Sequence, residues 1–372
     1  MKIAFDAKRA FNNRTGLGNY SRDTIRLLHR FYATDDYYLY HPKSIPDQHF
    51  ALDLDGVNYR TPQKAFFKKF HQLWRSFGMI PQLKSDQIDI YHGLSNEIPA
   101  GLAKHGIRAV VSIHDLIFIR YPKLYPAFDR KMYRIKFKAA CEQADCVIAI
   151  SEQTKADIIY YFGIPEEKIK VVYQGCHPIF QKEITASQLQ KVKEKFQLPN
   201  QFAFNVGTIE ERKNLMMVLK TMKTLKHLHL VAVGKPTAYS QQLDAYIKKH
   251  GLENRVHFLS GLQLEELAAL YRLATVFTYS SVFEGFGIPI LEALYSGTPV
   301  IAHKEGVFPE VGGPDSIYVP MNDEAAWVAA IDKVINNDDL RKQMSDKGRI
   351  FAQRFNDDKI AENLHKLYKS LL

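Results

Sequence analysis

The stretch from Val276 to Ala302 constrains the fold of this chain more than any other. It opens with an apolar run that is typical of a buried parallel strand, and a second such run follows at 298–302. Between them, Pro289 stands where the first turn of a helix needs no backbone N–H, and Gly297 stands where a helix would end. The stretch therefore predicts a strand, a loop, a helix and a second strand, the repeating unit of an open parallel sheet.

The loop of this unit, residues 280–288, follows a predicted strand at its carboxyl end, where open α/β sheets bind ligands. Gly285 and Gly287 let the backbone approach a ligand closely, and free amides at a helix start attract anions. Glu284 lies in the loop, and Glu292 follows eight positions later inside the helix. Because carboxylates accept strong hydrogen bonds from sugar hydroxyls, the whole string favours a binding loop over two unrelated glutamates.

Composition narrows the class of protein. A length of 372 residues predicts two domains, each with its own core. Hydrophobic residues make up 46% and charged residues 24%, as in soluble proteins, and no apolar run reaches the length of a membrane-spanning helix. The first residues resemble a strand more than a signal peptide, and the three cysteines lack metal-binding spacing. We expect a cytoplasmic protein with reduced cysteines.

The formal net charge is +10, which is typical of proteins that meet nucleic acid, anionic lipid or phosphorylated substrates. No nucleic-acid-binding module is recognised, so we expect no nucleic-acid partner. Residues 64–84 and 120–138 interleave aromatic with basic side chains, and Phe66, Phe70 and Phe77 share one face of a predicted helix. These segments are either core helices with solvated basic faces or a surface for anionic lipid or a lipid-linked acceptor.

Two loops in the first half also follow predicted strands. Gly16 and Gly18 lie between the first strand and the first helix, a position that suits close approach to a phosphate or sugar. The third glycine of a dinucleotide-binding fingerprint is missing, which argues against an NAD site. His114 follows the buried-type run 108–113, where either a ligand-binding or a structural histidine is found. His92 ends the preceding strand and is expected to line the same site.

The second half begins with a predicted strand at 202–206 that ends at Gly207, and Gly261 ends a later one. Arg212 and Lys213 stand between the first of these strands and a helical stripe. Two cations beside the positive end of a helix can clamp a diphosphate, although such pairs are solvated in most sequences.

Together, these motifs resemble those of a known protein family. Residues 284–289, followed by Glu292-Ala293 and by 297–300, resemble the signature of retaining GT-B glycosyltransferases of the family-4 type, the group 1 glycosyl transferases. The resemblance covers nearly the whole chain, strongly from about 202 to 320. One departure is Ser280-Ser281, where the family often has Pro-Ser.

The resemblance implies an α/β GT-B fold with two doubly wound Rossmann-like domains that face a cleft. Residues 1–178 would bind the acceptor and residues 179–354 the nucleotide-sugar donor. The last helix, within 355–372, would cross back onto the N-terminal domain.

The resemblance also assigns roles. Glu284 would contact the donor sugar, and Glu292 would hold the ribose hydroxyls. Arg212 and Lys213 become a diphosphate clamp, and His114 becomes a contact of the donor sugar. The expected catalytic residues are His114, Arg212, Lys213 and Glu284. The expected donor-binding residues are Gly16, Gly18, Gly207, Gly261, Gly285, Phe286, Gly287, Ile288 and Glu292.

The implied activity is retaining transfer of a hexosyl unit, with the mannosyl type favoured, to a glycan or lipid-linked oligosaccharide in cell-surface polysaccharide synthesis, including lipopolysaccharide. The donor would be a GDP- or UDP-linked sugar, with GDP-mannose favoured, and no metal or other cofactor is expected. The protein would lie in the cytoplasm or peripherally on the inner face of the cell membrane.

Three alternatives remain open. A sugar-nucleotide epimerase on the same fold would need acid and base residues around the sugar. A dinucleotide-dependent oxidoreductase is disfavoured by the missing fingerprint. A non-catalytic nucleotide-sugar or lipid-binding protein would neither hydrolyse nor transfer a labelled donor.

Overall fold

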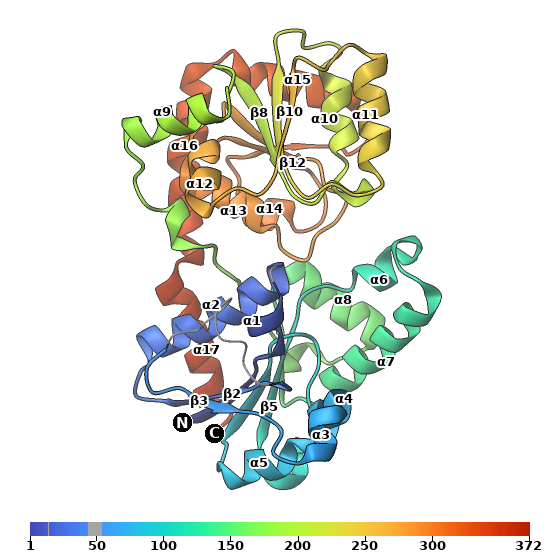
Figure 1. The fold of residues 1–372 in the computed structure, drawn as a ribbon, viewed down its shortest axis with the longest axis vertical. Helices are drawn as coiled ribbons and strands as arrows, with labels where there is room; N and C mark the ends of the chain where they lie inside the picture. The colour runs from blue at the N-terminus through green and yellow to red at the C-terminus, as the bar shows by residue number, and fades with distance from the viewer. Residues whose placement is uncertain (14, 44–53) are drawn as a thin grey trace. The chain divides into compact units, whose positions relative to one another are not determined.

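The chain folds into two compact units. A computed structural model describes residues 1–13, 15–43 and 54–372. The first unit consists of residues 1–175 together with 355–372, and the second of residues 176–354 (Figure 1). The boundary expected from the sequence lies at 178, whereas the first unit ends at Gly175.

The first unit is built on a seven-stranded sheet in the order β3-β2-β1-β4-β5-β6-β7. All its described neighbours pair in parallel. The chain runs outward from β1 to β3 and then from β4 to β7, so the strand order reverses between β1 and β4. Ligands of open α/β sheets bind at such a reversal. The strands are β1 (Lys2–Asp6), β2 (Asp36–Tyr40), β3 (Asn58–Arg60), β4 (Ile90–Gly93), β5 (Arg108–Ile113), β6 (Cys146–Ala149) and β7 (Ile169–Val171).

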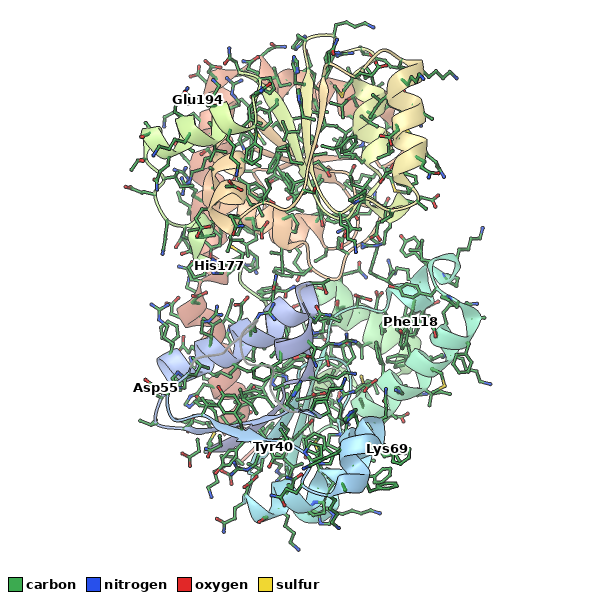
Figure 2. All side chains as sticks on the ribbon, in the orientation of Figure 1. Tyr40, Asp55, Lys69, Phe118, His177 and Glu194 are labelled. Atoms are coloured by element: carbon green, nitrogen blue, oxygen red, sulfur yellow. The ribbon has the colours of Figure 1, made fainter. Side chains whose placement is uncertain are left out.

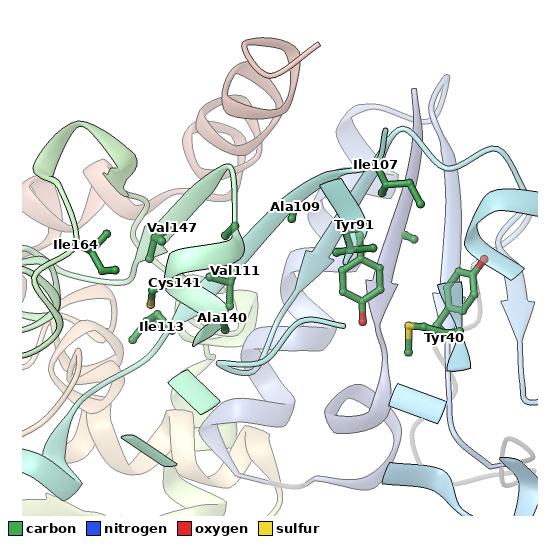
Figure 3. Packing of buried hydrophobic residues seen from close by; sticks show 14 of the residues in the cluster. Tyr40, Tyr91, Ile107, Ala109, Val111, Ile113, Ala140, Cys141, Val147 and Ile164 are labelled. Atoms are coloured by element: carbon green, nitrogen blue, oxygen red, sulfur yellow. The ribbon is translucent and has the colours of Figure 1, made fainter. Parts of the chain in front are cut away.

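Helices and short turns connect these strands. A buried cluster of apolar side chains, among them Tyr91, Val111 and Val147, fills the space between sheet and helices (Figure 3). The helices are α1 (Lys8–Asn12), α2 (Gly16–Phe31), α3 (Ala65–Lys69), α4 (His71–Leu73), α5 (Ile80–Ser85), α6 (Ile117–Arg120), α7 (Ala127–Gln143), α8 (Glu152–Phe162) and α17 (Asp357–Lys369). The short turns are the π turn η1 (Trp74–Gly78) and the 3₁₀ turns Leu102–His105, Pro122–Leu124 and Glu166–Lys168.

The last helix, α17, belongs to the first unit. Its His365 ring stacks on Tyr32 with ring centroids 3.6 Å apart. Its Tyr368 hydroxyl lies 2.6 Å from Nδ1 of His92 at the end of β4. The chain therefore returns from the second unit to complete the core of the first.

The expected continuous helical face over residues 66–77 is wrong. Helix α3 ends at Lys69, and Phe70 leaves the helical conformation with φ −106° and ψ 67° before α4 begins. Of the two alternatives, the core role is wrong for Phe66, Phe70 and Phe77, which are all exposed, whereas Trp74 is buried. Gly78 provides a reason, because a Cβ there would lie 2.6 Å from the Phe67 ring. Packing of Phe67 against this glycine fixes a tight turn that periodicity cannot reveal.

The second unit carries a six-stranded sheet in the order β10-β9-β8-β11-β12-β13, again with parallel neighbours. The order reverses between β8 and β11. The strands are β8 (Phe202–Val206), β9 (His229–Val233), β10 (Val256–Leu259), β11 (Val276–Tyr279), β12 (Val300–His303) and β13 (Ile317–Val319). The expectation of two open parallel sheets with helical connections is confirmed.

The helices of the second unit pack a separate core around Trp327, Ile301 and Leu230, which are all fully buried. They are α9 (Ala186–Lys195), α10 (Leu215–Thr221), α11 (Ser240–Lys249), α12 (Leu264–Leu273), α13 (Ile288–Ser296), α14 (Phe308–Gly312), α15 (Glu324–Ile335) and α16 (Asp338–Ala352). The 3₁₀ turns are Pro178–Phe180, η6 (Glu211–Lys213) and Gln353–Phe355, which leads back to the first unit. In the parts of the chain that the structure describes, no helix combines the length and apolar character needed to cross a bilayer.

Candidate functional site

The loop between β11 and α13 meets the turn η6 at the point where the strand order of the second sheet reverses. Oε1 of Glu284 lies 2.6 Å from Nζ of Lys213 and 2.8 Å from Nη1 of Arg212. Oε1 also accepts a hydrogen bond from the Ser281 hydroxyl at 2.6 Å. The structure thus brings together three of the four expected catalytic residues, although they come from segments about 70 residues apart.

The charge of Glu284 follows from these contacts. Burial by itself raises the pKa of this carboxyl, but the adjacent Lys213 and Arg212 cations outweigh burial and lower the pKa to about 2. Glu284 is therefore an ionised acceptor of hydrogen bonds at neutral pH and a poor general base.

The two cations are themselves paired. Nη2 of Arg212 lies 2.7 Å from Oε1 of Glu210, and Nη1 also donates to the Phe283 carbonyl oxygen at 2.6 Å. Nζ of Lys213 donates to the Tyr279 hydroxyl at 3.1 Å. Counting Glu210 and Glu284, the formal charges of this cluster cancel, so a diphosphate would have to compete with Glu210. The Glu210 side chain is 38% exposed and is the accessible member of the pair.

Ser280 and Ser281 tie the two segments together, a role that sequence reasoning missed. The Ser280 hydroxyl lies 3.1 Å from the carbonyl oxygen of Lys213 and 2.9 Å from that of Asn214. The backbone N–H of Val282 donates to the Arg212 carbonyl oxygen at 2.8 Å. The only sequence feature that could have indicated this role is that Ser280-Ser281 replaces the Pro-Ser that the family often has.

Arg212 and Lys213 lie in the 3₁₀ turn η6, and the helix that follows, α10, spans only residues 215–221.

Glu292 contrasts with Glu284. It lies on α13, and its Oε2 accepts a hydrogen bond from the Tyr271 hydroxyl at 2.8 Å. Burial raises its pKa to about 7, with a smaller opposing effect from that hydroxyl. Among the described residues no cation pairs with this carboxyl. One glutamate is thus locked in its ionised form, and the other changes charge near neutral pH.

The expected donor-binding glycines of the second unit lie at the carboxyl edge of the same sheet. Gly207 follows β8 with φ +150°, and a Cβ there would lie 3.4 Å from Cε of Lys213. Gly287 precedes α13 with φ +109°, next to Gly285, Phe286 and Ile288. Gly261 helps to line an open pocket of about 410 Å³ at the ends of β9 and β10, together with Val233, Gly234, Lys235, Pro236 and Ser260.

His114 lies in the first unit, just after β5, and is buried. Its Nε2 lies 2.9 Å from the Leu94 carbonyl oxygen, which can only accept, so Nε2 carries the hydrogen and Nδ1 is an acceptor. Burial lowers its pKa to about 4, so the ring is neutral at pH 7. The ring of Tyr20 on α2 meets His114 edge-on at 4.6 Å, which brings the first turn of α2, with Gly16 and Gly18, to the same edge of the sheet.

His92 is a structural histidine. Its Nδ1 lies 2.6 Å from the Tyr368 hydroxyl and its Nε2 lies 2.7 Å from the Ser112 hydroxyl, which in turn contacts the Tyr20 hydroxyl at 2.7 Å. Both ring nitrogens are therefore engaged, and the ring is fully buried. The expectation that His92 lines the site is not supported by this geometry.

Two cations that sequence reasoning passed over follow β1 directly. Lys8 and Arg9 are half-buried, and among the described residues neither side chain has a hydrogen-bond or ion-pair partner. Burial lowers the pKa of His114, and the positive charge of Arg9 lowers this pKa further. Arg9 therefore lies near the His114 ring. The strand-end position was the signal that could have identified both residues.

Replacing Gly18 by alanine is expected to destabilise the first unit by about 1–3 kcal/mol, because overpacking costs energy of this order. A Cβ at Gly18 would lie 1.9 Å from the carbonyl oxygen of Asn13. Gly16→Ala is the matched control, because a Cβ there meets no atom within 4 Å. Urea unfolding of both variants measures the difference, and equal stabilities would contradict the packing of Gly18 against Asn13.

Among the described residues no group of three or more histidine, cysteine or carboxylate side chains is arranged to hold a metal ion. A second pocket, of about 180 Å³, lies near the end of β3 and contains none of the expected site residues.

Comparisons with known proteins agree with the geometry of both units. The family "Glycosyl transferases group 1" matches residues 187–351, and "Glycosyltransferase Family 4" matches residues 15–178. O-antigen chain mannosyltransferase B of Escherichia coli is 27% identical over 392 residues, which cover 100% of both chains. O-antigen chain mannosyltransferase RfbU of Salmonella typhimurium is 30% identical over 226 residues, which cover 60% of each chain.

Solved structures share the fold. Anabaena HepE in complex with UDP superimposes with a TM-score of 0.78 at 17% identity, with 100% of both chains covered. Sucrose-phosphate synthase of Thermosynechococcus elongatus gives a TM-score of 0.79 at 21% identity, covering 100% of this chain and 99% of that one. The two family matches cover both units, and the two-sheet architecture is that of GT-B glycosyltransferases; the chain belongs to the group 1, family-4 type glycosyltransferases.

Proposed function

We propose that the protein is a retaining, metal-independent mannosyltransferase that uses GDP-mannose. Its acceptor would be a glycan or lipid-linked oligosaccharide in the synthesis of an O-antigen-like polysaccharide on the cytoplasmic side of the membrane. The names of the two relatives support the mannosyl unit and the class of product. The observation that carries the proposal is the cluster of Glu284, Arg212 and Lys213 at the carboxyl edge of the second sheet.

The cluster suits the chemistry of glycosyl transfer. As the bond between the anomeric carbon and the diphosphate breaks, the sugar ring gains positive charge and the leaving phosphate gains negative charge. Arg212 and Lys213 would stabilise the phosphate, with Arg212 exchanging Glu210 for a phosphate oxygen. Ionised Glu284 would accept hydrogen bonds from sugar hydroxyls, and Nδ1 of neutral His114 would accept another. No carboxylate pair suited to double displacement is present in the described cluster, so we favour attack from the face of the leaving group.

The same pKa values disfavour an epimerase. Acid–base catalysis works best when the pKa of the catalytic group lies near the operating pH. Glu284, with a pKa of about 2, and His114, with a pKa of about 4, both lie far below neutrality. Glu292 has a pKa of about 7, but its contact with Tyr271 on the flank of α13 suits ribose binding better than proton transfer at the sugar.

A donor screen followed by a transfer assay tests the proposal. GDP-mannose is expected to raise the melting temperature more than UDP-sugars, because a ligand at about 100 times its Kd adds about 2.7 kcal/mol of stability. Transfer from labelled GDP-mannose to a mannose-terminated acceptor should then proceed equally with and without EDTA, and NMR of the product should show the donor's anomeric configuration. Dependence on added Mg²⁺ or Mn²⁺ would contradict metal independence. A product with inverted anomeric configuration would contradict retention, and turnover only with UDP-sugars would contradict GDP-mannose as the donor.

A further inference from the structure

We propose that one surface of the first unit docks on an anionic lipid bilayer. This aromatic–basic surface consists of the exposed side chains of residues 64–84 and 120–138. The inference rests on the composition and exposure of these segments and not on the proposed sugar chemistry, although a lipid-linked acceptor would give such docking a purpose.

The net positive charge of the protein is concentrated in the two segments. Together they contain twelve lysines and arginines and one aspartate, a formal charge of +11, whereas the whole chain carries +10. The remaining residues are therefore close to neutral. Eight of the twelve cations form no salt bridge with any described residue. These eight are Lys64, Lys68, Lys69, Lys84, Lys123, Arg130, Lys131 and Arg134.

The same segments expose apolar side chains. They span 40 residues but contain nine of the sixteen large hydrophobic side chains that are exposed in the described chain. The most exposed are Phe128 at 74%, Phe66 at 56% and Ile135 at 55%. Helix α7 fully buries only Ala140 and Cys141, at its C-terminal end, so most of its side chains are exposed or only partly covered by the described residues.

Tertiary contacts join the two segments. Glu97 lies between them, with Oε2 3.2 Å from Nη1 of Arg75 and Oε1 3.3 Å from Nζ of Lys136. Phe118 on α6, labelled in Figure 2, lies just before the second segment, and its ring holds Tyr133 and Phe137 of α7 with centroids 5.6 Å and 5.3 Å away. In Figure 1, α3 and α4 lie beside α7 on one flank of the first unit. The cations and rings of both segments can therefore meet one partner at the same time.

The pattern fits a lipid surface better than a protein. Basic residues attract anionic headgroups, and aromatic rings that stand among them insert at the level of the headgroups. A protein interface usually has an apolar centre with few charges, whereas here lysines and arginines alternate with the rings. Long basic side chains also keep their charge in water while their stems lie on apolar surroundings.

Vesicle binding by the full chain tests the proposal. The probes are vesicles of pure phosphatidylcholine and vesicles that contain about one third phosphatidylglycerol, an anionic fraction that attracts polybasic segments. Sedimentation should recover the protein with the anionic vesicles at low salt, and binding should weaken at about 1 M salt, where the screening length is short. Equal partitioning onto both kinds of vesicle, or no binding to either, would overturn the proposal, and the latter would direct attention to a protein partner.

Matched variants assign the binding to this surface. Lys68→Gln/Lys69→Gln/Lys131→Gln should reduce partitioning by about a hundredfold, given the usual contribution of a lysine near an anionic bilayer. Lys191→Gln/Lys248→Gln/Lys249→Gln removes the same charge from exposed positions of the second unit and should leave partitioning within about twofold of the parent. Equal losses in the two triple variants would overturn the assignment, because net charge alone would then explain binding.

The rings need their own test. Phe66→Ser/Phe128→Ser should reduce partitioning by about tenfold or more, because apolar area drives interfacial insertion. Tyr160→Ser is the control, since this side chain of the first unit is 81% exposed and lies outside the surface. Unchanged binding of the double variant would overturn insertion of the rings. Release of GDP with a water-soluble acceptor, measured on every variant, keeps this test separate from that of the proposed activity.

Discussion

Lys213→Met is expected to lower the rate of sugar transfer about a hundredfold while the chain stays folded. Nζ of Lys213 lies 2.6 Å from Oε1 of Glu284, and in the proposed function it stabilises the leaving phosphate. Removing one fixed donor of this kind typically costs about 3 kcal/mol in the transition state, or about a hundredfold in rate. Steady-state kcat with a labelled donor measures the loss. Lys333→Met makes the same change at an exposed position on α15 and should leave kcat unchanged.

Acid unfolding provides a second readout for the same variant. In the parent, the pKa of Glu284 is lowered from 4.5 to about 2, so its contribution to stability is present above pH 4.5 and is lost as the pH falls toward 2. Without Lys213 this pKa rises, so the contribution to stability is smaller and its loss is complete at a higher pH. Arg212→Met is a less selective test, because Arg212 also binds Glu210 and the Phe283 carbonyl oxygen. Near-normal kcat in Lys213→Met would remove Lys213 from the proposed clamp.

Nucleotide affinity is expected to rise by about 25-fold between pH 5.5 and 7.5, if the ribose binds the ionised form of a group with a pKa of 7. Glu292 is that group, because burial raises its pKa to about 7 and the hydrogen bond from Tyr271 offsets only part of this effect. Binding should release a proton below pH 7, which titration calorimetry in buffers of different ionisation enthalpy detects. In the unliganded protein the sign is opposite: a raised carboxyl pKa lowers stability as the pH rises from 4.5 to about 7.

Glu292→Gln is the control for this pH dependence. The amide keeps the size of the side chain but cannot ionise, so its nucleotide affinity should be low and flat across the same pH range. If the parent and Glu292→Gln showed the same pH profile, another group would be responsible for it. Changes in GDP binding alone, measured without acceptor, suffice for the comparison.

Some of this structure is readable from the sequence because local chemistry decides it. Pro289 and Gly297 predict a helix between them, and α13 spans Ile288–Ser296 with Gly297 at φ +76°. Strand ends followed by glycine or charge also predict the edge of the sheet at which Gly207 and Glu284 lie. In residues 64–78, by contrast, the turn depends on how Phe67 packs against Gly78, and hydrophobic periodicity carries no information about that contact.

The energetics of the site were less predictable than its members. Arg212, Lys213 and Glu284 were expected residues, but their mutual distances depend on segments about 70 positions apart. Arg212 is already paired with Glu210, so the two cations do not form the open clamp that the sequence predicts. The difference in pKa between Glu284 and Glu292 arises from burial and from the cations beside only one of them. Such effects appear only when the tertiary neighbours are known.

The return of α17 to the first unit has a consequence for synthesis. Residues 355–372 supply Tyr368 and His365, which complete buried hydrogen bonds and ring contacts around β4 and α2. During translation these residues leave the ribosome only after the whole second unit. The first unit therefore cannot finish folding until the second unit has been synthesised, and until then Nδ1 of His92 lacks its contact with Tyr368. A nascent chain would need its second half to fold independently while the first waits, open to chaperones.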